Sequence, residues 1–213
     1  MLCVAYQAIR AADPGAIIVS AGLAPVGRID NIWNGHYGHD GQNQDEREWM
    51  HEFIAAEGHN CADVIGFHPM GFRADFDAEP DIDGGTPETD CTNGFCFRTI
   101  EKFREVMDER QIDMPIWATE VGWIVAPPEA CLSDPSWTGR EWQIVTPEAR
   151  DANIAGALDY AEDNYPWLEA LFVFNLNFSE APWYDLCEQM RYYSVGSPVV
   201  EFTRTYLPLM RRE

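Results

Sequence analysis

The sequence predicts an α/β fold of the (β/α)8 barrel type (TIM barrel), of which its 213 residues would form only the C-terminal half, strands five to eight with their helices. Four short apolar runs, each bounded by turn residues, match the strands of a buried parallel sheet. Amphipathic segments with a helical period lie between them, and each run ends in a polar side chain. We therefore expect one partial barrel domain over residues 1–213, a fragment that lacks strands one to four.

The predicted strands cover residues 16–20, 63–68, 115–120 and 171–175. Each is apolar at consecutive positions, as in a strand that is covered on both faces. The intervals between them leave room for a loop and a helix, which implies right-handed crossovers between parallel strands. In a barrel the carboxyl ends of these strands would gather Ser20, His68, Glu120 and Asn175 at one face. A short open doubly wound sheet is the alternative arrangement.

Helical patterns precede and separate the strands. The chain opens in a helix that has Leu2, Tyr6 and Ile9 on one face and ends at Asp13-Pro14-Gly15, so we expect sequence upstream of Met1. Two more helices are predicted around residues 49–57 and 97–107. Thr146 followed by Pro147 is a helix start signal before the apolar positions of residues 154–161. The same signal at Ser197-Pro198 predicts a last helix.

Composition excludes several classes of function. The chain has 36 acidic and 14 basic residues, a formal charge of −22, which disfavours nucleic acid and anionic membrane surfaces as partners. No apolar run is long enough to span a bilayer, and no glycine-rich nucleotide-binding pattern follows a predicted strand. The Gly-x-Ser-x-Gly pattern of esterases is also absent. We expect a neutral or cationic ligand and no cofactor.

The six cysteines point to an oxidising compartment. Cys91, Cys96, Cys131 and Cys187 lie in segments rich in turn residues and are the disulfide candidates, although the sequence does not give their pairing. Cys3 and Cys61 adjoin apolar periodic segments, so we expect them to be buried free thiols.

The segment from residue 117 to residue 123, Trp-Ala-Thr-Glu-Val-Gly-Trp, is the most informative in the chain. A carboxylate at the end of a buried strand, between two tryptophans, suits a site that cleaves sugars, because the carboxylate can meet the anomeric carbon while aromatic rings stack on the sugar. The alternative is a solvated glutamate at a strand end. We favour the functional interpretation, since strand ends are where barrels carry catalytic residues.

This segment resembles the nucleophile motif on the seventh strand of retaining glycoside hydrolases of clan A, the group that includes families five and thirty-nine. Residues 66–71, Gly-Phe-His-Pro-Met-Gly, are similar to the sixth-strand motif of that clan. The resemblance implies that Glu120 is the nucleophile and that His68 contacts it or the sugar. Asn175 and Asn177 stand where the clan usually has a tryptophan beneath the sugar, so Trp123 or Trp183 would supply the stacking face.

The resemblance also implies a second carboxylic acid that follows an asparagine on strand four, but the sequence contains no Asn-Glu pair. The fragment alone is therefore expected to be inactive or nearly so. The expected substrate is an oligo- or polysaccharide, outside the cell. The alternative function is a non-catalytic carbohydrate-binding or interaction module on a degenerate barrel, and the open edges of a half barrel would favour self-association.

Weaker motifs are assigned no metal. His36 and His39 lie in a glycine-rich loop without a third ligand, so we expect His36 to line the substrate cleft or a turn. The acidic residues 75–90 lack the spacing of a calcium-binding EF-hand and are expected to form a solvated loop. Four loop tryptophans fit either carbohydrate stacking or loop anchoring, namely Trp33, Trp137, Trp142 and Trp183.

Overall fold

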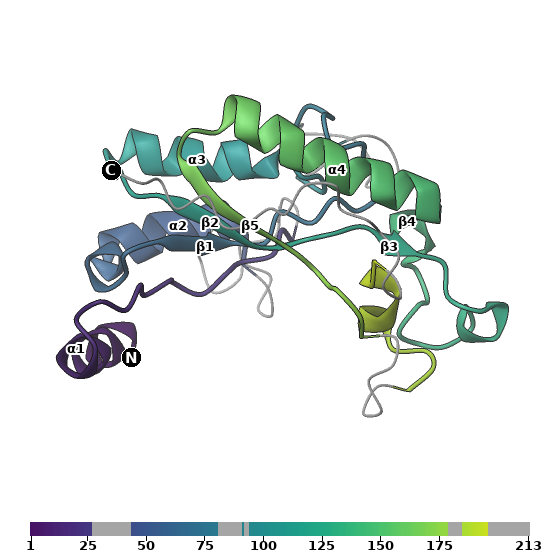
Figure 1. The fold of residues 1–213 in the computed structure, drawn as a ribbon, viewed down its shortest axis with the longest axis horizontal. Coiled ribbons are helices and arrows are strands. Elements are labelled where there is room, and N and C mark those ends of the chain that lie inside the picture. The colour runs from purple at the N-terminus through teal and green to yellow at the C-terminus, as the bar shows by residue number, and fades with distance from the viewer. Residues whose placement is uncertain (27–43, 81–90, 92–93, 179–184, 196–213) are drawn as a thin grey trace.

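A computed structural model describes residues 1–26, 44–80, 91, 94–178 and 185–195 (Figure 1). Its centre is a three-stranded parallel sheet in the order β1 (Ile65–Phe67), β2 (Ile116–Val121) and β5 (Leu168–Val173). A separate parallel pair is formed by β3 (Ile124–Val125) and β4 (Ile144–Val145). The prediction of an α/β fold with parallel strands is confirmed.

The prediction of a half barrel of the TIM type is wrong. The described residues form sheets of three and two strands, and not four strands of an eight-stranded barrel. Residues 16–20 do not form a strand; they lie beside β1 through an isolated parallel bridge between Val19 and Val64, and the Ser20 hydroxyl accepts the amide of Gly66 at 2.9 Å. Two backbone groups in this segment bond to side chains, whereas a regular ladder would pair them with another strand. The Ile18 amide donates to the Asp63 carboxylate, and Arg10 donates to the carbonyl of Ala16.

Among the residues that the structure describes, four α-helices form where the sequence predicts them: α1 (Leu2–Ala12), α2 (Glu46–Ala55), α3 (Thr99–Glu109) and α4 (Pro147–Asn164). Pro147 begins α4, and the hydroxyl of Thr146 caps it by accepting the amide of Ala149 at 3.1 Å. The helix predicted at Ser197-Pro198 lies outside the described residues. In the described part of the chain no helix is long and apolar enough to cross a membrane.

The hydrophobic core lies between the sheet and the helices. Phe67 of β1 stacks on Phe103 of α3 with ring centroids 4.3 Å apart, and both are fully buried. Ile116 and Ala118 of β2, together with Ile154 of α4, join the same cluster. In Figure 1, α3 and α4 both lie over the same side of the sheet, and side chains of both belong to the core cluster.

Helix α1 lies apart from this core, at the end of the molecule in Figure 1, and has no buried residue. A disulfide between Cys3 and Cys61 attaches it, together with an ion pair between Arg10 and Asp63. The expectation of free thiols at Cys3 and Cys61 is therefore wrong, because the two short segments that carry them pack together. The other four cysteines pair as Cys91–Cys96 and Cys131–Cys187, as expected of disulfide candidates.

Candidate functional site

Glu120 lies at the carboxyl end of β2, the central strand of the sheet. The buried side chains of β2 point into the core, whereas Thr119 and Glu120 are only partly covered, and 36% of the Glu120 side chain is exposed. Parallel pairing places Phe67 opposite Ala118, so the residue that follows β1 lies next to the end of β2. That residue is His68.

His68 and Glu120 are in contact, with 3.5 Å between Nδ1 and Oε2. The imidazole is more enclosed than the carboxylate, at 22% exposure. Burial lowers the pKa of His68 from its ordinary 6.5, and the negative charge of Glu120 only partly opposes that shift. A neutral imidazole beside the carboxylate can orient it without cancelling its charge.

The segment that follows residues 16–20 encloses His68 from the other side. The amide of His68 donates to the carbonyl of Leu23 at 2.8 Å. A Cβ atom at Gly22 would lie 2.2 Å from Nε2 of His68 and 2.5 Å from Oγ1 of Thr119, so a larger residue does not fit there. Gly22 is a site residue that sequence reasoning missed, and the signal available was a glycine directly after an apolar run.

Tyr193, in the short helix η4 (Gln189–Tyr193), also approaches this site. Its ring lies 3.3 Å from the position that a Cβ atom at Gly122 would take. Burial raises the pKa of Tyr193 to about 12; the charge of Arg140 opposes that shift, and the charge of Glu120 adds to it. The hydroxyl of Tyr193 therefore stays protonated at neutral pH. No sequence signal singled out Tyr193, because it lies far from Glu120 in the chain.

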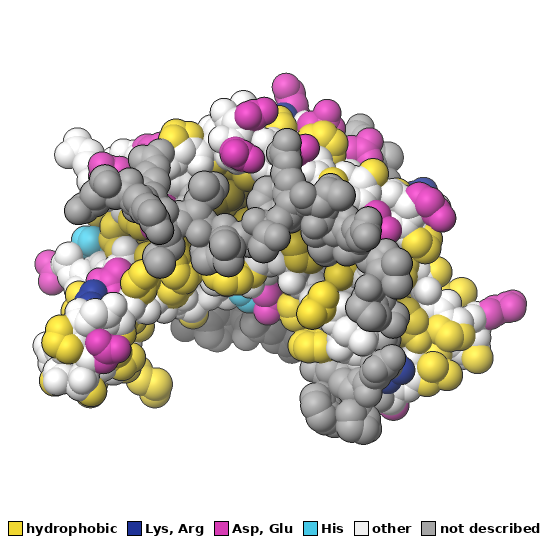
Figure 2. Space-filling view, in the orientation of Figure 1, with side chains coloured by type: hydrophobic (Ala, Val, Ile, Leu, Met, Phe, Trp, Pro, Cys, Tyr) yellow, Lys and Arg dark blue, Asp and Glu magenta, His cyan; other side chains and the backbone are white. Residues whose placement is uncertain are grey.

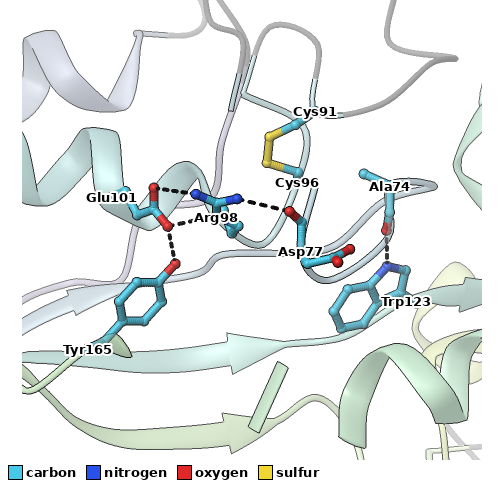
Figure 3. Close-up of a disulfide and its surroundings, with 8 residues drawn as sticks. All are labelled: Ala74, Asp77, Cys91, Cys96, Arg98, Glu101, Trp123 and Tyr165. Carbon is cyan, nitrogen blue, oxygen red and sulfur yellow. Dashed lines mark hydrogen bonds and ion pairs between the residues drawn. A yellow bond between two sulfur atoms is a disulfide. The ribbon is translucent and has the colours of Figure 1, made fainter. Parts of the chain in front are cut away.

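Trp123 does not supply the stacking face predicted for it. The indole is fully buried, and its Nε1–H donates to the carbonyl of Ala74 at 2.8 Å (Figure 3). Gly71 lies directly against the ring, where a Cβ atom would come within 1.8 Å of Cε2. Trp123 therefore anchors the loop after β1 to the end of β2. Trp137 is an anchor of the same kind, buried and bonded to the carbonyl of Cys187.

Asn175 is also committed to the fold. Its side chain is buried, its Nδ2 donates to the carbonyl of Met190, and its Oδ1 accepts from the hydroxyl of Ser194 and the amide of Phe178. The expectation that it binds substrate is corrected, because both ends of the amide already have partners. Asn177 lies half-buried two residues further on.

The remaining sequence predictions fall on other parts of the chain. His36 and Trp183 lie outside the described residues, as do Trp33 and most of the acidic loop. Within the described ranges, no three His, Cys, Asp or Glu side chains come together in a way that could hold a metal ion.

One buried carboxylate escaped sequence reasoning. Glu46, in the first turn of α2, is buried and accepts the amide of Val26 at 3.3 Å. Burial, with a contribution from the charge of Asp45, raises its pKa to about 7.

Comparison with known proteins adds no relative: no family model matches this chain, and no curated protein matches its sequence.

Proposed function

We propose that this chain belongs to a retaining glycoside hydrolase in which Glu120 is the nucleophile. The observation that supports the proposal is the position of Glu120: a partly exposed carboxylate at the carboxyl end of a central parallel strand, 3.5 Å from the imidazole of His68. Active sites of parallel α/β proteins lie at this edge of the sheet. The motif around Glu120, which resembles the nucleophile segment of such hydrolases, supports the same role.

The reaction assigned to Glu120 is nucleophilic substitution at the anomeric carbon. A carboxylate oxygen forms a bond to that carbon, and the glycosidic bond breaks with its electron pair leaving on the departing oxygen. Water then attacks the anomeric carbon, and the bond to Glu120 breaks and returns the free carboxylate; the proton that water loses balances the proton that the departing oxygen takes up. His68 is a positioning residue, whose neutral ring fixes the orientation of the carboxylate and leaves its charge available for attack.

The charge of the chain indicates the substrate class, and its disulfides indicate the compartment. A net charge of −22 disfavours acidic polymers, which leaves neutral oligo- or polysaccharides as the substrates that fit best. Three disulfides favour an extracellular or otherwise oxidising compartment.

The test uses a substrate that needs no proton donor. Dinitrophenyl 2-deoxy-2-fluoro-glycosides of glucose, galactose, mannose and xylose carry a leaving group that departs without protonation, and they trap the glycosyl-enzyme. With a matching sugar, the protein should release one equivalent of dinitrophenolate and gain the mass of one fluorosugar on the peptide that contains Glu120.

Glu120→Gln should abolish this labelling without loss of folding, as judged by circular dichroism. Glu169→Gln is the matched control, because Glu169 is an exposed carboxylate on the neighbouring strand β5, and it should label like the parent. Labelling of a different residue, or of none with any of the four sugars, would contradict the proposal.

A second candidate function is carbohydrate binding without catalysis. The observation in its favour is that the sequence has no Asn-Glu pair to match the proton donor of the hydrolases it resembles. This function predicts no labelling of Glu120 together with glycan affinity that survives Glu120→Gln.

A further inference from the structure

Three aromatic side chains from separate segments meet near the carboxyl edge of the sheet. Phe72 follows β1, Phe95 precedes α3, and Trp142 lies in the short helix η3 (Glu141–Gln143) before β4. The Trp142 ring is nearly parallel to Phe72, with an interplanar angle of 14° and centroids 5.6 Å apart. The ring centroid of Phe95 lies 5.2 Å from that of Trp142 and 4.8 Å from that of Phe72. We refer to Phe72, Phe95 and Trp142 as the aromatic platform.

The aromatic platform is fixed to the strand that carries Glu120. The amide of Gly71, next to Phe72, donates to the carbonyl of Gly122 at 3.0 Å, two residues beyond Glu120. Two residues after Phe72, the carbonyl of Ala74 accepts the indole N–H of Trp123 (Figure 3). The loop that carries Phe72 is therefore held at both ends by the segment that follows Glu120.

Backbone strain at Phe72 and a disulfide around Phe95 hold two rings of the aromatic platform in place. Phe72 has φ of +52°, in the left-handed region that bulky residues rarely adopt. Backbone strain of this kind is concentrated at ligand-binding sites, where the surrounding structure enforces it. Phe95 lies between Cys91 and Cys96, whose buried disulfide closes its loop against Ala74 (Figure 3). The rings of Phe72 and Phe95, which these features hold, are only partly buried.

We propose that the aromatic platform binds a sugar unit of a neutral glycan at a distance from the bond cleaved at Glu120. The inference rests on the proposed function and adds to it a second binding position, so that longer chains bind more tightly. Flat aromatic faces suit the apolar faces of pyranose rings. The platform rings belong to loops at the edge of the sheet where Glu120 lies, and the charge of −22 favours a neutral chain over an acidic one.

The experiment measures how affinity depends on chain length. Binding of neutral β-linked gluco-, manno- and xylo-oligosaccharides, from disaccharide to hexasaccharide, is followed by calorimetry in the Glu120→Gln protein, which cannot turn them over. Affinity should rise with length. Adding Trp142→Ala should weaken hexasaccharide binding by roughly tenfold and leave disaccharide binding unchanged, because the short ligand does not reach the platform.

Trp167→Ala is the matched control. Trp167 is also half-buried and stacks on Tyr165, but it precedes β5 at the opposite edge of the sheet, so affinity should not change. Trp142→Phe should retain most of the length dependence.

The platform is refuted if Trp142→Ala binds the hexasaccharide as tightly as its parent, or loses affinity equally at every length, as expected if the rings only anchor loops. Glu120 labelling tests the hydrolase separately. Length-dependent binding that needs Trp142, without labelling of Glu120, supports the platform and overturns the hydrolase. Labelling of Glu120 without any effect of Trp142→Ala supports the hydrolase and overturns the platform. Failure of every oligosaccharide to bind overturns the platform, and the labelling of Glu120 then decides the hydrolase by itself.

Discussion

At the scale of single residues, the contact between His68 and Glu120 sets the electrostatics of the candidate site. Burial and the neighbouring charge act on the imidazole in opposite directions, and burial is the larger effect. The histidine is therefore held neutral at a pH where an exposed histidine would begin to take up a proton. A neutral ring is what a positioning role next to a nucleophilic carboxylate requires.

Removing the charge of Glu120 should lower the pKa of His68 further. In Glu120→Gln the attraction that favours the imidazolium is lost, while the burial that disfavours it remains. The measurement is the pH titration of the His68 Cε1–H resonance by NMR in the parent and the variant. Glu162→Gln, which removes an exposed carboxylate on α4, is the control and should leave the pKa of His68 unchanged. An unchanged or higher pKa in Glu120→Gln would show that the charge of Glu120 does not favour the imidazolium form of His68.

At the scale of elements, α2 begins with a buried acid. An acidic residue in the first turn normally favours a helix, but Glu46 is enclosed, and its pKa of about 7 exceeds its ordinary 4.5. Between about pH 4.5 and pH 7 the folded state therefore holds a proton on Glu46 that the unfolded state has released. This contribution to stability is fully present below pH 4.5 and is lost as the pH rises towards and beyond 7.

Glu46→Gln should accordingly stabilise the protein at alkaline pH. The amide oxygen can still accept the Val26 amide, and no charge has to be buried. At pH near 8 the variant should be more stable by about 3 kcal/mol, and the difference should vanish near pH 4. Urea unfolding across this range measures it. Glu48→Gln, in the same turn, is the control and should show no such trend. An equal effect of Glu46→Gln at both pH values would show that the difference in stability does not come from the charge of Glu46.

Elements were predictable from sequence where the pattern was long or chemically specific. The start of α4 at Thr146-Pro147 is an example, because a capping hydroxyl and a proline act locally. Strands β3 and β4 were missed, since two residues each leave no periodicity. Glu120 and His68 could be singled out because each ends an apolar run, and the structure places the two side chains in contact. The roles of Trp123 and Asn175 were misassigned because residue type does not reveal which way a side chain turns at a strand end.

At the scale of the whole molecule, charge repulsion opposes folding. Acidic side chains are spread over the face shown in Figure 2, with few basic ones between them, consistent with a net charge of −22. Some carboxylates have local partners: Glu101 accepts two bonds from Arg98 and one from Tyr165 (Figure 3). Fourteen basic residues leave most of the 36 acids without a matching charge.

Salt should therefore stabilise the folded protein. Raising NaCl from about 10 mM to about 150 mM shortens the screening length from roughly 30 Å to roughly 8 Å, which weakens repulsion between distant carboxylates. We expect the melting temperature at pH 7 to rise by about 2 to 4 °C. Thermal unfolding by circular dichroism measures it, and an equal osmolality of sucrose separates screening from solute exclusion. A melting temperature that falls with NaCl would mean that local ion pairs dominate.

The disulfide between Cys3 and Cys61 makes the attachment of α1 independent of the polypeptide between them. A single proteolytic cut within residues 4–60 would leave both pieces in one covalent molecule. They would separate only after reduction, so the N-terminal helix would stay with the sheet even when the chain that connects them is broken.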